Sequence, residues 1–226
     1  MRHLSATLAL WAALTACAQA AEPITLGLNY PRTGPYKEEG LAQMRGALLA
    51  IDEINAAGGV LGRPLRLSSK DTASRPAKAV KNVDKLAAEG AAMLFGGSSS
   101  AVAIAAGKRA KEHGLLYFGT LTYSNDTTGK DGHRYLFREC NNAWMSAAVL
   151  GKHLSKTQAG KQFFYITADY TWGHTSESSL RQATATQDDQ RHPGLKVPFP
   201  GARISDHQAA LKQRSEERRV GKECLR

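Results

Sequence analysis

A run of three serines behind two glycines has the residue types in this sequence best suited to holding a ligand. Residues 92–95 are expected to form a short apolar strand, a Gly-Gly pair follows, and Ser98-Ser99-Ser100 opens an alanine-rich helix. Glycines allow a sharp turn and a close approach to a ligand. The hydroxyls and the unpaired first amides of the helix suit a carboxylate or another small anion. Alternatively, Ser98 or Ser99 only caps the helix.

Alternating strands and helices must position this run. We expect strands at residues 24–28, 65–67, 92–95, 115–118 and 135–138, and helices at residues 41–54, 77–87, 102–110 and 143–154. Such alternation predicts an α/β fold with a parallel sheet, in which ligands bind at the carboxyl ends of the strands.

The first helix is predicted from apolar residues at steps of three and four, and Gly58-Gly59 ends it. These apolar residues are Leu41, Met44, Leu48, Ile51 and Ile54. The prolines and glycine of residues 29–36 predict an irregular loop before this helix, and Asp71 and Thr72 are expected in the loop after the second strand.

The alternation restarts after residue 140. A strand at residues 163–166, a loop at 168–174, a helix at 175–187 and a weak strand at 195–197 are expected. We therefore predict a first lobe over residues 21–140 and a partial second lobe over residues 141–213, with too few strands for a stable sheet of its own.

The first 20 residues have the features of an export signal. Met1–Ala20 has a weakly basic start, a short apolar run and an A-x-A cleavage site. A lipoprotein signal is the overlapping alternative, with Cys17 as the lipidated residue. Both interpretations predict a location outside the cytoplasm, which is the periplasm for the exported soluble form.

Residues 214–224 resemble the in-frame translation of a sequencing adapter, so we treat residues 214–226 as foreign sequence, and a charged surface helix is the alternative. We therefore expect the natural chain to be cut near Gln213. The formal net charge is +10; removing Arg2 and five tail cations leaves 24 Lys and Arg, and removing three tail glutamates leaves 17 Asp and Glu, or about +7. The remaining basic residues are spread out and accompany no nucleic-acid-binding motif, so we expect no nucleic-acid partner.

Residues for catalysis or metal binding are not apparent in this pattern. Cys140 is the one cysteine outside the two ends, so neither an internal disulfide nor a zinc site is expected. No nucleotide-binding glycine motif occurs, and the histidines have no partner at a metal or triad spacing. We expect no catalytic residue, no metal and no cofactor, which argues against an enzyme.

Five features together resemble the class I periplasmic substrate-binding proteins of ABC importers, in the branch typified by the leucine/isoleucine/valine-binding protein. The resemblance extends over nearly all of residues 24–213. The features are the loop through Thr33-Gly34-Pro35, the Asn55-Ala56-Ala57-Gly58-Gly59 junction, Asp71, the serine run, and Asp169-Tyr170-Thr171-Trp172-Gly173.

The resemblance implies a two-lobed fold that closes on a small solute in an inter-lobe cleft and delivers it to a membrane permease. By position, Ser98 and Ser99 would hold a carboxylate, completed by the backbone of Leu121 and the side chain of Thr122 or Tyr123. Trp172 falls where the second lobe places an aromatic ring on the ligand. This sequence departs from the family in three ways. It lacks the family's disulfide and the remainder of the second lobe. The position of the family's first-loop tyrosine is occupied by Glu39, with Tyr36 nearby.

The aromatic residues expected at strand ends suggest a flat or apolar ligand. They are Tyr30, Tyr36, Tyr123, Tyr170 and Trp172, each of which could instead anchor a loop. Arg32 could pair with an acid and Asp169 with an amine, or Asp169 could cap the next helix. The hypothesis is a monomeric importer component for a small carboxylate or amide, such as an amino acid, an aromatic acid or urea. The alternative is a ligand-sensing module of the same fold that acts with a receptor.

Overall fold

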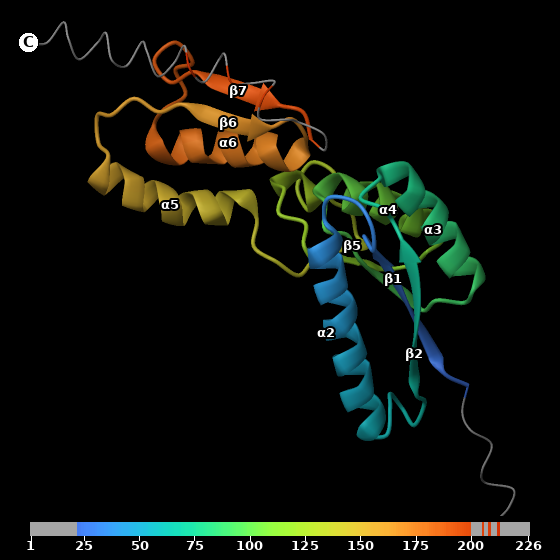
Figure 1. Cartoon of the computed structure of the whole chain (residues 1–226). Coiled ribbons are helices and arrows are strands. Elements are labelled where there is room, and N and C mark those ends of the chain that lie inside the picture. Colours follow the sequence, from blue (N-terminus) through green and yellow to red (C-terminus); the bar gives the residue numbers. More distant parts are fainter. Residues whose placement is uncertain (1–21, 200–204, 206–207, 209–211, 213–226) are drawn as a thin grey trace, which may run out of the picture. The chain divides into compact units, whose positions relative to one another are not determined.

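The computed structural model describes residues 22–199, 205, 208 and 212, and it divides the chain into two compact α/β units. Unit 1 consists of the described residues up to Leu121 together with Gly132–Cys140. Unit 2 consists of Thr122–Asp131 and the described residues from Asn141 onward. Each unit has its own parallel sheet, as the α/β prediction required (Figure 1).

Unit 1 contains a five-stranded parallel sheet in the order β2-β1-β3-β4-β5. Its elements are β1 (Ile24–Tyr30), α2 (Lys37–Ala56), β2 (Leu65–Asp71), α3 (Pro76–Ala88), β3 (Met93–Gly96), α4 (Ser100–Glu112), β4 (Tyr117–Gly119) and β5 (Leu136–Arg138). The sheet separates α2 from α3 and α4 (Figure 1). Right-handed crossovers require this arrangement, because the chain passes from β1 to β2 in one direction and from β2 to β3 in the other.

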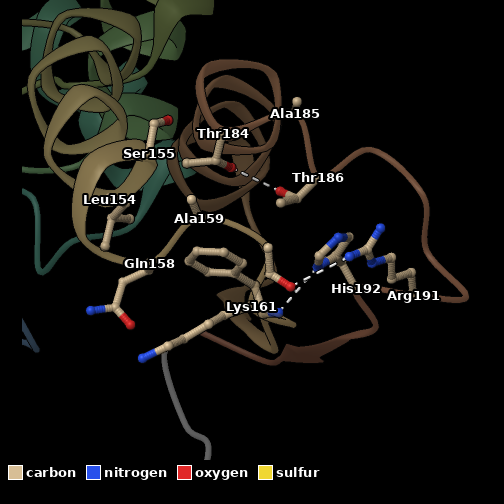
Figure 2. Close-up of a pocket in the computed structure, with 12 residues that line it drawn as sticks. Leu154, Ser155, Gln158, Ala159, Lys161, Thr184, Ala185, Thr186, Arg191 and His192 are labelled. Atoms are coloured by element: carbon tan, nitrogen blue, oxygen red, sulfur yellow. Dashed lines mark hydrogen bonds between the residues drawn. The ribbon is translucent and has the colours of Figure 1, made fainter.

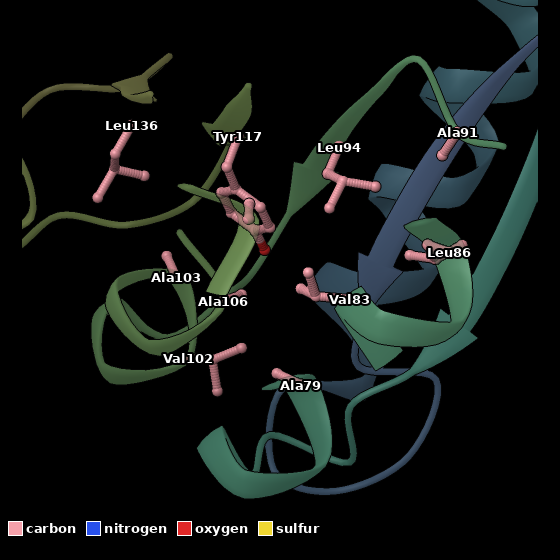
Figure 3. Close-up of a cluster of buried hydrophobic side chains, with 11 residues drawn as sticks. Ala79, Val83, Leu86, Ala91, Leu94, Val102, Ala103, Ala106, Tyr117 and Leu136 are labelled. Atoms are coloured by element: carbon pink, nitrogen blue, oxygen red, sulfur yellow. The ribbon is translucent and has the colours of Figure 1, made fainter. Parts of the chain in front are cut away.

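The core of unit 1 lies between the sheet and the α3–α4 layer (Figure 3). Leu94 and Tyr117 from the strands pack against Val83 and Leu86 of α3, and all four side chains are fully buried. The alanines of α4 allow that helix to pack closely on the sheet. The Tyr117 hydroxyl has no hydrogen-bond partner among the described residues, and burial raises its pKa well above the ordinary value.

The first two strands are longer than expected, because polar residues at their ends are satisfied inside the fold. Asn29 is fully buried; its Nδ2 donates to Ala79 O at 3.0 Å, and its Oδ1 accepts from Asn82 Nδ2 at 3.0 Å. The pairing of β1 with β2 continues to Tyr30 and Asp71. The expectation that Tyr30 belongs to the irregular loop is therefore wrong, since it is the last residue of β1, at the expected strand end, with 4% of its surface exposed.

The buried face of α2 differs from the expected one. Gly40 and Ile51 are buried, whereas Leu48 and Ile54 are 45% and 37% exposed. The close contact of α2 with the loop before it determines this orientation, because a Cβ on Gly40 would lie only 1.9 Å from the carbonyl oxygen of Pro31. Only a glycine allows this contact, and the helix is therefore turned with Gly40 toward the preceding loop.

Unit 2 contains a two-stranded parallel sheet of β6 (Tyr165–Ala168) and β7 (Gly194–Val197), with the helices α5 (Ala143–Thr157) and α6 (Thr171–Thr184) and the short 3-10 helix η1 (Asn125–Thr127). The helix predicted at residues 175–187 begins four residues earlier. A Cβ on Gly173 would lie 1.9 Å from Ala168 O, so this glycine lets α6 start directly against the end of β6. As a result, Trp172 lies in the first turn of a helix and not in the expected loop.

Residues 122–131 were expected in the first lobe but belong to unit 2. Hydrogen bonds to α6 explain this difference. Asn125 Nδ2 donates to Ser179 Oγ at 2.9 Å, and Thr171 Oγ1 donates to Asp126 Oδ2 at 3.0 Å. The Asp126 carboxylate thus accepts a hydrogen bond from the first residue of α6, a position that favours negative charge.

The two ends of the chain lie outside the described residues. This applies to the export signal at residues 1–20, to Cys17 and to the segment 214–226. Among the residues that are described, no helix combines the length and the apolar character needed to cross a membrane.

Candidate functional site

The serine loop, residues 96–100, follows β3 through a turn that only glycine allows. Gly96 has φ +123° and Gly97 has φ +84°. A Cβ on Gly96 would lie 2.4 Å from Asn29 O, on the neighbouring strand β1. The amide of Gly97 donates to the same carbonyl oxygen at 3.0 Å. The predicted sharp turn is thus present, and it directs the three serines to the carboxyl end of the sheet.

Helix α4 begins at the end of this turn without a side-chain cap. Ser99 is the N-cap residue, but its side chain makes no capping hydrogen bond. In the described part of the chain its hydroxyl has no partner, although the residue is only 7% exposed. The capping alternative is therefore not realised for Ser99. Its hydroxyl and the first amides of α4 can still donate hydrogen bonds, which suits an anion.

Ser98 accepts a hydrogen bond from Gln43, a residue that was not among the predicted site residues. Gln43 of α2 donates through Nε2 to Ser98 Oγ, and its Oε1 accepts from Thr120 Oγ1 at 3.0 Å. Gln43 is half-buried and lies three residues, about one turn, after buried Gly40 of α2. Its partners lie 55 and 77 residues away, so no local pattern in the sequence could have identified it.

The loop between β1 and α2 is held by Asp71 at the end of β2. Its Oδ1 accepts from the amides of Arg32 and Thr33 at 2.9 and 3.2 Å, and its Oδ2 accepts from Thr33 Oγ1 and Lys78 Nζ at 2.8 Å each. A further bond comes from the Ala73 amide. Burial alone would raise the pKa of Asp71, but these hydrogen bonds outweigh it and keep the pKa well below its usual value.

Replacing Asp71 with alanine is expected to lower the free energy of unfolding by about 2–3 kcal/mol at pH 7, because hydrogen bonds to a charged group contribute about that much. The folded-state pKa of Asp71 is depressed, so this stability is present above the unfolded pKa of about 3.9 and is lost as the pH falls below it. Urea unfolding of both proteins at pH 7 and pH 3 measures the effect.

The difference between the two proteins should shrink at pH 3, and an equal difference at both pH values would contradict the assignment. Lys78→Met is the matched control, because it removes the ammonium group at 2.8 Å and leaves the three amide donors in place. Its loss should be smaller than that of Asp71→Ala.

Other predicted residues of unit 1 lie near the ends of its strands. Tyr36 is the half-buried N-cap residue of α2, and Arg32 and Glu39 are exposed. Leu121 is half-buried and follows β4 by two residues. Arg32 is held through its backbone amide by Asp71, which is a structural contact.

Unit 2 brings Tyr123 and Trp172 to the same cavity. This cavity has a volume of about 350 Å³ and lies between α5 and α6, where Ala147, Leu150 and Leu180 contribute apolar side chains. Thr122, by contrast, is fully buried, and its Oγ1 lies 2.7 Å from Thr127 Oγ1. The Thr122 hydroxyl thus contacts a residue of its own unit.

Tyr170 and Asp169 lie between β6 and α6. The Tyr170 ring lies 6.0 Å from the Trp172 ring and stacks on Phe199 at 5.2 Å. Asp169 Oδ1 lies 2.7 Å from His174 Nε2, and the N-cap residue of α6 is Tyr170 without a side-chain cap. The suggestion that Asp169 caps the helix is therefore wrong, since its carboxylate contacts the histidine one turn into α6.

A second cavity in unit 2, of about 160 Å³, is shown in Figure 2. Its lining includes Leu154 at the end of α5, Thr184 at the end of α6, and His192, whose Nδ1 accepts from Phe163 N at 3.0 Å. Phe163 precedes β6, so this cavity lies at the amino end of the strand. Open α/β sheets bind ligands at the carboxyl ends, which favours the Tyr123 and Trp172 side of the unit.

Groups that could hold a metal ion are absent among the described residues. Cys140 is half-buried and forms no disulfide. The donors at the end of β3 are hydroxyls and amides, which suit binding of an anion and offer no nucleophile paired with a base.

Comparison with known proteins adds independent findings. Residues 23–213 match the family described as periplasmic binding protein. A Leu/Ile/Val-binding protein from Rhizobium johnstonii is 31% identical over 173 residues, which cover 76% of this chain and 46% of the relative. A leucine-, isoleucine-, valine-, threonine- and alanine-binding protein from Pseudomonas aeruginosa is 29% identical over 188 residues, which cover 83% of this chain and 48% of the relative.

Solved structures show the same fold. A branched-chain amino acid transporter substrate-binding protein from Streptococcus pneumoniae, in complex with isoleucine, has a TM-score of 0.70 and 25% identity, covering 84% of this chain and 53% of that one. A solute-binding protein of R. palustris, in complex with benzoate, has a TM-score of 0.72 and 24% identity. The match covers 87% of this chain and 53% of that one. The chain therefore spans about half the length of the relatives that it matches.

Proposed function

The chain belongs to the periplasmic binding protein family, and from this premise we propose that it is the solute-binding component of an ABC importer. The names of the curated relatives support amino-acid binding in particular. The proposed activity is binding and delivery to an inner-membrane permease, without catalysis and without a cofactor. The proposed location is the periplasm, after export by the signal at residues 1–20, and the alternative is a lipid anchor at Cys17.

The serine loop carries this proposal. Ser99 has a free hydroxyl among the described residues, α4 has no side-chain cap, and Gly96 and Gly97 bring the backbone to the end of the sheet. Hydroxyl and amide donors at a helix N-terminus recognise a carboxylate. The proposed solute is accordingly a small carboxylate or amide, with an amino acid or an aromatic acid as the principal candidates.

The residues proposed to contact the solute come from both units. In unit 1 they are Ser98, Ser99, Leu121 and Tyr36, and in unit 2 they are Thr122, Tyr123, Asp169, Tyr170 and Trp172. Support is strongest for Ser99, whose hydroxyl has no partner among the described residues, and for Tyr123 and Trp172, which line one apolar cavity. Aromatic walls favour an apolar or flat solute body.

Isothermal titration calorimetry of the full-length protein with leucine, benzoate and urea tests this proposal. We expect binding of at least one of the two acids, and we expect Ser99→Ala to weaken it about tenfold because a hydrogen bond to a charged group is lost. Ser178→Ala, at an exposed position of α6, is the control and should leave binding unchanged. No heat from any of the three compounds would contradict the ligand class.

The sensing alternative shares this binding step and differs in the partner. Genes for a permease and an ATPase beside the coding sequence would support import. A kinase or regulatory operon at that place would support sensing.

A further inference from the structure

Gln43 connects three segments of unit 1 that are far apart in the sequence. Its side chain extends from α2 and bonds to Ser98, 55 residues away, and to Thr120, 77 residues away. Ser98 follows β3 and Thr120 follows β4, so both hydroxyls lie at the carboxyl end of the sheet. The Thr120 amide also donates to Gly96 O at 3.2 Å, which ties the β4 end to the serine loop.

The hydrogen bonds through Gln43 run in one direction. Thr120 Oγ1 donates to Gln43 Oε1, and Gln43 Nε2 donates to Ser98 Oγ. A carboxamide has a donor end and an acceptor end, whereas a hydroxyl can both donate and accept. Ser98 Oγ therefore accepts from Gln43, and its own proton stays available. Among the described residues, Ser98 Oγ has Gln43 as its partner and no acceptor for that proton.

We infer that Gln43 is a positioning residue that makes the Ser98 hydroxyl a hydrogen-bond donor toward the solute. The inference rests on the proposed function and sharpens it. Ser98 O–H then joins the Ser99 hydroxyl, which can donate or accept, and the first amides of α4, which only donate. At Ser98, this arrangement favours a carboxylate oxygen over the NH2 group of a primary amide.

A purely structural role for Gln43, tying α2 to the sheet, gives a different expectation. Loss of a structural tie would lower the affinity for acids and amides alike. If Gln43 instead holds Ser98 as a donor, its loss would lower the affinity for the acid alone. The freed Ser98 hydroxyl could then either donate to a carboxylate oxygen or accept from an amide NH2 group. The ratio of acid affinity to amide affinity therefore separates the two roles.

Gln43→Met tests the inference, because methionine has a similar length and no amide. Affinities of the full-length protein are measured by calorimetry for leucine against leucinamide and for benzoate against benzamide. We expect the affinity for the acid to fall by up to about tenfold with little change for the amide, because the bond to the carboxylate weakens when the Ser98 hydroxyl is no longer held as its donor. An unchanged acid-to-amide ratio would overturn the inference while acid binding by the wild type still supported the proposed function.

Thr120→Val is the matched control, since it removes the bond to Gln43 Oε1 and leaves the bond from Nε2 to Ser98 in place. Its acid-to-amide ratio should stay within about threefold of the wild type, because only the remote hydrogen bond is lost. If Gln43→Met does not fold, Gln43→Leu takes its place under the same criterion. Failure of the wild type to bind either acid would overturn both the proposed function and this inference.

A double-mutant cycle with Ser98→Ala gives a second readout that does not depend on stability. Once the Ser98 hydroxyl is absent, Gln43→Met should change the affinity for the acid by less than about twofold, because Gln43 acts through that hydroxyl. A full tenfold loss on the Ser98→Ala background would instead show that Gln43 acts by another route and would overturn the inference.

Discussion

Gly96→Ala is expected to destabilise unit 1 by about 3 kcal/mol or more and to abolish solute binding, because it adds both a steric clash and backbone strain. The new Cβ would lie 2.4 Å from Asn29 O and 3.0 Å from Asn29 C. Both atoms are backbone atoms of β1, which cannot move aside without opening the pairing of Asn29 with Gly96. Urea unfolding measures the stability, and calorimetry with leucine and benzoate measures the binding.

Gly114→Ala is the matched control for this substitution. Gly114 has φ +68°, and a Cβ there would meet no atom within 4 Å. It therefore reports the cost of the left-handed backbone alone, about 1–2 kcal/mol. Equal losses at Gly96 and Gly114 would contradict the view that close approach of β1 and β3 shapes the serine loop.

Arg181→Met is expected to have a similarly large effect in unit 2. Arg181 is 8% exposed; its Nε donates to Glu177 Oε1 at 2.6 Å, and its Nη1 donates to the carbonyl oxygens of Thr186 and His192 at 2.8 and 2.9 Å. Its guanidinium also lies 4.1 Å from the centre of the Tyr165 ring. Removing one partner of a buried ion pair costs about 3–5 kcal/mol, because the remaining groups stay buried without partners.

Hydrogen exchange of the amides of β6 and β7 measures this effect, since Arg181 connects α6 to the segment leading into β7. We expect those amides to lose protection in Arg181→Met. Arg191→Met is the control, because Arg191 is exposed and, within the described part of the chain, its side chain makes one hydrogen bond, of 3.4 Å to Gly160 O, so its loss should be about 0.5 kcal/mol. Unchanged protection in Arg181→Met would show that the ion pair with Glu177 does not hold the unit together.

The same ion pair illustrates what a sequence pattern leaves out. Glu177 and Arg181 are four residues apart, a spacing that usually describes an exposed pair on a helix. Burial would raise the pKa of Glu177, but hydrogen bonds from Thr167 and Arg181 outweigh it and lower that pKa. Burial of the pair depends on β6, which precedes α6, and on the loop before β7, which follows it, so the spacing within the helix does not reveal it.

Local features were predicted well where one residue type decides the backbone. The Gly-Gly turn after β3 and the start of α4 follow from conformational freedom and helix-end chemistry, which depend on neighbouring residues. Predictions were wrong where a specific packing or side-chain contact decides, as for Leu48 and Ile54 on α2 and for Asp169 near α6. There, the approach of Gly40 to Pro31 and the contact of Asp169 with His174 determine the orientation.

By itself, the sequence determined the order of strands and helices, the parallel sheet and the position of the serine loop, because periodicity and glycine placement act over a few residues. Only the tertiary structure decided which groups surround that loop. Gln43 reaches Ser98 and Thr120 through packing of α2 and pairing of the strands, and residues 122–131 join unit 2 through hydrogen bonds to α6. These contacts span 45 to 77 residues, so they depend on the whole fold, and no short pattern encodes them.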